Sequence, residues 1–153
     1  MNKRILRAAG ACVTTIAIAT GIALGGATPA MAVGYTAYCD SVVRSQDFPT
    51  TMNAVTVCRI QGGPASEGYF PGKFRYTGTA DGSIGINTWK GFQVFLGQYG
   101  YNGPIDGVPG KNTYMAMQNY AATAGYSGPI DGDMGANSWS YLNRAMRTSF
   151  FAN

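Results

Sequence analysis

A repeat with a period of 25 residues is the feature of this 153-residue chain that most restricts its fold. Asp-Gly dipeptides begin at Asp81, Asp106 and Asp131, and each is followed at the same interval by a second glycine, at Gly85, Gly110 and Gly135. Each unit continues with three further matching residues: Asn87, Thr88 and Trp89; Asn112, Thr113 and Tyr114; Asn137, Ser138 and Trp139. A pattern that keeps its register through three copies predicts stacked supersecondary units that bury one common core.

Apolar residues within each unit recur at helical spacing, so one face of each helix can be buried. This spacing predicts helices near residues 86–99, 111–124 and 136–149, with Trp89 and Trp139 on the buried face. Gly100 and Gly125 follow the first two helices and suit the left-handed conformation that is common at helix C-termini. The Gly-Pro-Ile-Asp-Gly stretches that come next predict short turns.

The segment before the repeat has a different composition. Residues 35–43 and 53–60 are rich in Tyr, Val and Thr and carry Cys39 and Cys58. Such residues favour strands, so we expect a small β-hairpin closed by a Cys39–Cys58 disulfide. The Gly- and Pro-rich residues 61–80 are expected to form a loop. The expected organisation is a hairpin and loop extension at 33–78, followed by a three-helix domain at 79–153.

Residues 1–32 have the pattern of a secretory signal peptide. Three basic residues precede an apolar run at 8–27, and Ala30 and Ala32 occupy the small-residue positions of a cleavage site. Glycines interrupt the run and no basic cluster follows it, which disfavours a membrane anchor. Cleavage after Ala32 would leave one pair of cysteines in an oxidising compartment, where they are expected to join.

The charge of the exported chain excludes an electrostatic footprint for nucleic acid. The whole chain carries a net charge of +4, but three of its basic residues lie in the leader. Eight Lys and Arg then remain against seven Asp and Glu, a net charge of +1. We therefore expect a secreted, extracellular or cell-wall-associated protein with no nucleic acid partner and no membrane contact after cleavage.

The residue types that usually perform catalysis are scarce. The chain has no His and a single Glu, Glu67, so a Ser-His-Asp or Cys-His arrangement is impossible. Asp81, Asp106 and Asp131 could form pairs of catalytic carboxylates, but a role in turns explains why a glycine follows each of them. Asp131 with Asp133 lacks the further ligands of an EF-hand calcium loop. We expect no catalytic residue, no metal and no cofactor.

The series Asp-Gly-x-x-Gly-x-Asn-Thr-Trp, Phe-Gln and Gly-Tyr-x-Gly-Pro-Ile-Asp-Gly resembles the peptidoglycan-binding-like domain family. The resemblance covers Thr79 to the C-terminus. It implies a compact, mainly α, three-helix module that serves secreted cell-wall hydrolases as a non-catalytic anchor on peptidoglycan. Because only 48 residues separate Ala32 from Asp81, we expect no catalytic domain beside the module.

Candidate ligand-binding residues lie at the ends of the first two units. Sugar rings stack on aromatic side chains, and their hydroxyl and acetamido groups need neutral hydrogen-bonding partners. The residues that combine these groups beside the Asp-Gly turns are Tyr101, Asn102, Asp106, Tyr126, Ser127 and Asp131. The alternative is that both tyrosines cap the helix ends by packing under the turns.

Three functions follow from these observations. The first is a secreted, non-catalytic protein that binds peptidoglycan or another cell-wall glycan. The second is a secreted protein-interaction factor, an inhibitor or effector that uses the same scaffold to bind a protein partner, since a fold does not fix a function. The third is a small cell-wall hydrolase.

Overall fold

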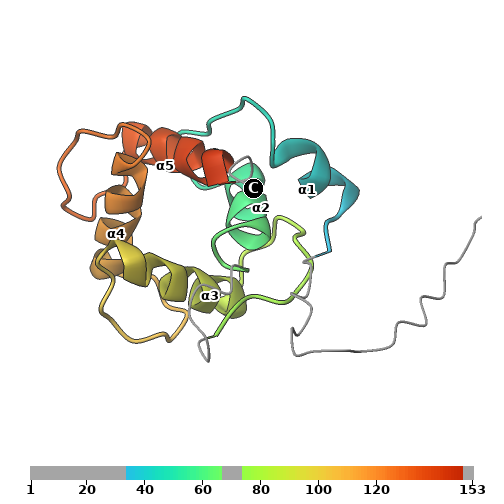
Figure 1. Cartoon of the computed structure of the whole chain (residues 1–153), viewed down its shortest axis with the longest axis horizontal. Coiled ribbons are helices and arrows are strands. Elements are labelled where there is room, and N and C mark those ends of the chain that lie inside the picture. The colour runs from blue at the N-terminus through green and yellow to red at the C-terminus, as the bar shows by residue number, and fades with distance from the viewer. Residues whose placement is uncertain (1–33, 67–73, 150–153) are drawn as a thin grey trace, which may run out of the picture.

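The computed structural model describes residues 34–66 and 74–149, and this part of the chain is mainly helical. Its elements are α1 (Ala37–Val42), α2 (Ala54–Gly62), α3 (Ile86–Leu96), a 3-10 helix η1 (Gly97–Tyr99), α4 (Lys111–Ala122) and α5 (Ala136–Ser149). Figure 1 shows α2, α3, α4 and α5 arranged around a common centre, with α1 on the outside next to α2. The predicted signal peptide, residues 1–32, lies outside the described residues.

The three helices predicted from the repeat are confirmed. The first continues from α3 into η1 and ends at Gly100, which has φ 90°. Gly125, after α4, has φ 101°, so both glycines adopt the left-handed conformation expected of them. Trp89 and Trp139 are buried in the core, as their place on the apolar face predicts.

The predicted β-hairpin is wrong, because Cys39 and Cys58 both lie in helices. Thr36 caps α1 by accepting a hydrogen bond from the Cys39 N–H, and Asn53 caps α2 by accepting one from the Thr56 N–H. Every residue of α2 from Val55 to Gln61 is buried. Burial on all sides and a good N-cap therefore override the weak strand preference of Val and Thr. Within the described residues, the nearest approach to a strand is an isolated bridge between Tyr35 and Ala80.

The predicted disulfide is present and joins α1 to α2 through Cys39 and Cys58. Both sulfur-bearing side chains are fully buried, in a small cluster with Val43 and Ala80. Closing a loop of this length stabilises a fold by about 3 kcal/mol in the chain-entropy model. The bond thus ties a short outer helix to the helical core.

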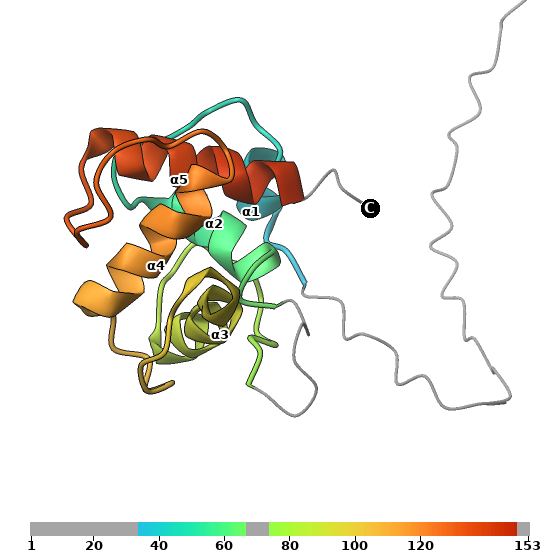
Figure 2. The same ribbon diagram turned by 60° about the vertical axis from the view of Figure 1, so that its left-hand side comes forward.

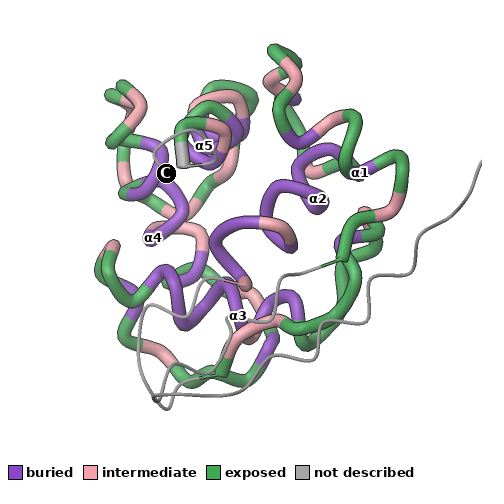
Figure 3. The backbone as a smooth tube through the Cα atoms, turned by 45° about the vertical axis from the view of Figure 1, so that its right-hand side comes forward, coloured by how far each residue is buried: buried purple, intermediate pink, exposed green. Residues whose placement is uncertain are grey.

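The four longer helices form a closed arrangement. Each helix contacts the next in the chain, and α5 returns to contact α2 (Figure 2). Buried segments face the interior and exposed turns lie outside (Figure 3). Equivalent positions of the four helices supply the fully buried residues Ile60, Phe92, Met117 and Leu142. Because the same position is buried in all four helices, α2 is a structural counterpart of α3, α4 and α5.

A buried polar contact closes the ring between α5 and the N-terminal segment. Asn143 Oδ1 accepts a hydrogen bond from Arg59 Nη1 at 3.1 Å, and Asn143 Nδ2 donates to Thr56 Oγ1 at 3.0 Å. Arg59 also donates to the carbonyl oxygens of Val43 and Ser45. A buried guanidinium is tolerated only when such acceptors surround it. The contact therefore fixes how the first half of the chain packs on the last helix.

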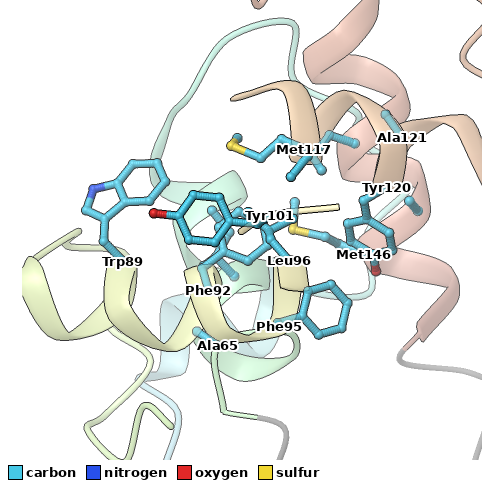
Figure 4. Packing of buried hydrophobic residues seen from close by; sticks show 14 of the residues in the cluster. Ala65, Trp89, Phe92, Phe95, Leu96, Tyr101, Met117, Tyr120, Ala121 and Met146 are labelled. Carbon is cyan, nitrogen blue, oxygen red and sulfur yellow. The ribbon is translucent and has the colours of Figure 1, made fainter. Parts of the chain in front are cut away.

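The division at residue 78 stays a prediction about domains, but the core extends across it. Ile60 and Ala65 belong to the same apolar cluster as residues of α3, α4 and α5. Figure 4 shows Ala65 near Phe92 and Leu96 within this cluster. Across 34–66 and 74–149, none of the helices has the length and apolar character needed to cross a bilayer.

The geometry of the Asp-Gly turn predicts that Gly107 and Gly85 differ sharply in their tolerance of a side chain. Gly107 has φ 80°, and an added Cβ would clash with Ile86 Cγ1 and lie 2.6 Å from the Ile86 carbonyl oxygen. Gly107→Ala should therefore lower the free energy of unfolding by about 1–3 kcal/mol. Gly85→Ala is the matched control, because Gly85 has φ −136° and open space around it. Thermal unfolding measures both, and equal midpoints would contradict this account of the turn.

Candidate functional site

One buried glutamine in a helix holds each of the two Asp-Gly turns that carry the predicted ligand residues. Gln93 Nε2 donates hydrogen bonds to Asp106 Oδ1 at 3.0 Å and to the Val108 carbonyl oxygen at 3.1 Å. The Gly107 N–H donates to Gln93 Oε1 at 2.8 Å. Gln118 makes the corresponding bonds to Asp131, Gly132 and Asp133. Each turn is thus fixed to the helix that precedes it.

A third copy of this contact was not predicted from the sequence. Gln61 of α2 donates to Asp81 Oδ1 at 3.0 Å and to the Ser83 carbonyl oxygen, and accepts from the Gly82 N–H. Gln61 precedes its aspartate by 20 residues, whereas Gln93 and Gln118 precede theirs by 13. The longer connection takes α2 out of the 25-residue register, and this hides it from a search at a fixed period.

Hydrogen bonds lower the pKa of each turn aspartate. For Asp106 the main cause is the Val108 N–H and the next is Gln93; for Asp131 it is Gln118 and then the Asp133 N–H. For Asp81 the Ser83 N–H comes first and Gln61 second. Carboxyl groups with lowered pKa values are ionised and poorly suited to act as general acids at neutral pH. This geometry supports the turn interpretation of the three aspartates.

The predicted tyrosines also bond to turns. Tyr101 donates its hydroxyl to the Pro104 carbonyl oxygen at 2.6 Å, and Tyr126 donates to that of Pro129 at 3.1 Å. Tyr101 is only 9% exposed and lies in the core cluster, which Figure 4 shows around Leu96. Tyr126 is half-buried and packs near the Tyr141 ring. Both rings therefore support the turns, and Tyr126 offers more of its surface to a ligand.

Tyr76 is a further member of this set that the sequence interpretation missed. Its hydroxyl donates to the Thr79 carbonyl oxygen at 2.7 Å, which is the same three-residue relation as in the later turns. An added Cβ on Gly78 would meet the Tyr76 hydroxyl, as one on Gly103 would meet that of Tyr101. Tyr76 lies 25 residues before Tyr101, so the period itself could have identified it.

Two equivalent grooves lie between these turns and the helices that follow them. The first groove, of about 310 Å³, is lined by Tyr101, Gly103, Pro104, Asp106, Val108 and residues 110–113. The second groove, of about 510 Å³, is lined by Tyr126, Ser127, Gly128, Pro129, Asp131, Asp133, residues 135–138 and Tyr141. Every position that lines the first groove also lines the second, 25 residues later. The repeat therefore places one type of surface twice on the molecule.

The predicted ligand residues divide between these surfaces. Tyr101 and Asp106 line the first groove, and Tyr126, Ser127 and Asp131 line the second. Asn102 lies instead in an adjoining hollow of about 290 Å³, together with Gln93 and Gly97. The structure thus brings five of the six residues to two equivalent sites.

Asn112 and Asn137 line the grooves with exposed amides, but they were not among the predicted ligand residues. Each is the second residue of its helix, and each lines a groove. Among the described residues, neither side chain forms a hydrogen bond that supports the fold. A residue that repeats without a structural bond can serve a ligand, and an amide offers both donors and an acceptor. Their recurrence at the same position of successive units was the signal.

The described residues contain no cluster of three or more His, Cys, Asp or Glu that could hold a metal. Each groove instead presents a tyrosine, a hydrogen-bonded turn carboxylate and an asparagine amide, with Lys111 added in the first groove and Asp133 in the second. This set suits the recognition of a neutral or weakly charged polar ligand. Comparison with protein-family models, curated proteins and solved structures finds no match for this chain.

The turn aspartates predict an acid-dependent loss of stability. Their pKa values in the folded protein lie below the ordinary 3.8. Their contribution to the free energy of unfolding is therefore complete above pH 3.8 and is lost as the pH falls through the lowered pKa values. The triple variant Asp81→Asn, Asp106→Asn and Asp131→Asn keeps an acceptor oxygen at each turn but cannot ionise. Urea unfolding from about pH 5 to pH 2 should show a smaller loss for this variant than for the parent, and parallel curves would contradict the assignment.

Proposed function

We propose that the protein is an exported, non-catalytic cell-wall binding protein that holds peptidoglycan in its first and second grooves. The observation that carries this proposal is the recurrence of one groove lining 25 residues later, with an exposed asparagine in each copy whose side chain makes no hydrogen bond to the described part of the chain. A polymer with a repeated unit can occupy two such sites at once. Weak binding at each groove then adds up to useful avidity.

The chemistry of the linings supports a carbohydrate polymer. The half-buried ring of Tyr126, with Tyr141 beside it, offers an apolar face for a sugar ring. Asn112 and Asn137 can bond to hydroxyl or acetamido groups. The disulfide between Cys39 and Cys58 agrees with a protein that works outside the cytoplasm.

A protein partner is the second candidate, and exposed apolar residues favour it. Ile86 and Val108 are 56% and 65% exposed, and Ile86 packs against the Gly107 turn that carries Val108. Exposed apolar residues that lie together can mark a protein contact. A pull-down on insoluble peptidoglycan distinguishes the two, because a protein-interaction factor would stay in the supernatant without its partner.

The repeated asparagines give the sharpest test of the proposed function. Each hydrogen bond lost to the ligand costs about 0.5–1.5 kcal/mol, so Asn112→Ala with Asn137→Ala should weaken binding about fivefold or more. Sedimentation with purified insoluble peptidoglycan measures the change. Asn87→Ala is the matched control, since Asn87 has the same helix position but lines neither groove.

The parent must pellet with peptidoglycan, and the double variant must remain folded by circular dichroism. Tyr101→Ala would be a poor test, because the Tyr101 ring lies in the core and its loss would unfold the turn. If the folded double variant pellets as the parent does, the grooves are not the binding site. If the parent never pellets, the protein-interaction function replaces the proposed one.

A further inference from the structure

The two grooves share a frame but differ in charge. Where the first groove has Val108 and Lys111, the second has Asp133 and Ala136. Asp106 and Asp131, the carboxylates present in both grooves, accept hydrogen bonds from their turns and glutamines. The charged group found in the first groove alone is therefore the ammonium of Lys111. The charged group found in the second groove alone is the carboxylate of Asp133.

The charge of Lys111 is not required by the packing at its position. An added Cβ on Gly132 would lie 2.8 Å from Lys111 Cγ, so the aliphatic stem rests on the next turn. The apolar side chain of Ile86 makes the corresponding contact with Gly107, and that of Ala54 makes it with Gly82. An apolar side chain satisfies the fold at this position in two other helices. This packing contact therefore does not need the ammonium group.

The position of Lys111 is also unfavourable for a cation. It is the first residue of α4, where the helix dipole disfavours positive charge. The corresponding residues that begin α2, α3 and α5 are Ala54, Ile86 and Ala136. Lys111 lies near enough to Asp131 to contribute to the lowered pKa of that carboxyl, although the Gln118 bond is the main cause. Its contact with Gly132 places it where the first groove meets the turn of the second.

We infer that Lys111 makes the first groove selective for a carboxylate-bearing group of the ligand, and that the second groove takes a neutral sugar unit. This inference rests on the proposed function and assigns different parts of the polymer to the two grooves. Val108 is exposed and lines the same groove as Lys111, so it suits a small apolar group next to the carboxylate, such as a methyl group. A methyl group beside a carboxylate occurs at a terminal alanine of a cell-wall peptide and at the lactyl ether of an acidic amino sugar.

Three soluble probes separate these sources in NMR titrations of the purified protein. Diacetyl-Lys-D-Ala-D-Ala carries the peptide carboxylate, N-acetylmuramic acid carries the lactyl carboxylate, and the N-acetylglucosamine tetramer is neutral. We expect at least one carboxylate probe to shift the amide signals of residues 103–113. We expect the neutral tetramer to shift those of residues 128–138. The carboxylate probe that binds more tightly identifies the source.

Lys111→Met removes the ammonium and keeps the aliphatic stem. It should weaken binding of the carboxylate probe about two- to fivefold, as for the loss of an exposed ion pair, and leave the neutral probe unaffected. Added salt should weaken binding of the carboxylate probe to the parent protein but not to the Lys111→Met variant. Lys90→Met is the control for the loss of one nearby positive charge, because Lys90 lies on α3 and lines neither groove, although its charge reaches Asp106 of the first groove. Ala136→Lys should give the second groove a measurable affinity for the carboxylate probe.

The outcomes separate this inference from the proposed function. If the parent pellets with peptidoglycan but Lys111→Met binds the carboxylate probes with the affinity and salt dependence of the parent, the inference is overturned and the proposed function survives. Failure of both carboxylate probes to bind a parent that pellets overturns the inference in the same way. If the parent does not pellet, the proposed function itself fails.

Discussion

The hydrogen bonds between a buried glutamine and the next Asp-Gly turn are the interaction on which the rest of the structure depends. A glutamine amide has two donors and an acceptor, and each of Gln61, Gln93 and Gln118 uses both kinds on its turn. Each turn leads directly into the next helix, so this contact positions successive helices relative to one another. A buried amide left without these partners would cost about 1–3 kcal/mol, which makes alternative turn conformations unfavourable.

The same constraint produces the grooves. The tyrosine and the aspartate that line each groove are both held by hydrogen bonds at the turn, which fixes this wall of the groove. Asn112 and Asn137 line the two grooves, and within 34–66 and 74–149 their side chains form no hydrogen bond that supports the fold. A site with fixed walls loses little entropy on binding, and the presence of two such grooves is the basis of the proposed binding to a repeating polymer. Function in this account follows from the way the fold repeats its turns.

The helices α3, α4 and α5 and their turns could be predicted because their signals are local and occur in register. Helix α2 could not, since its spacing to the next turn is longer and its Val and Thr residues favour strands in isolation. The contact between Arg59 and Asn143 joins residues 84 positions apart in the sequence, and no local sequence pattern predicts it. Five of the six predicted ligand residues line the grooves, but the burial of Tyr101 depends on tertiary packing. The asparagines were visible in the repeat, but only the structure shows that their side chains form no supporting hydrogen bond among the described residues.

The claim that two equivalent grooves bind one polymer is tested most directly by mapping the bound surface. Solubilised peptidoglycan fragments of increasing length should be titrated into isotope-labelled protein, with amide shifts assigned along the chain. The account predicts shifts that cluster at residues 103–113 and 128–138, with an affinity that rises when a fragment becomes long enough to reach both. Shifts centred on the exposed apolar residues Ile84 and Ile86, or an affinity independent of fragment length, would contradict it.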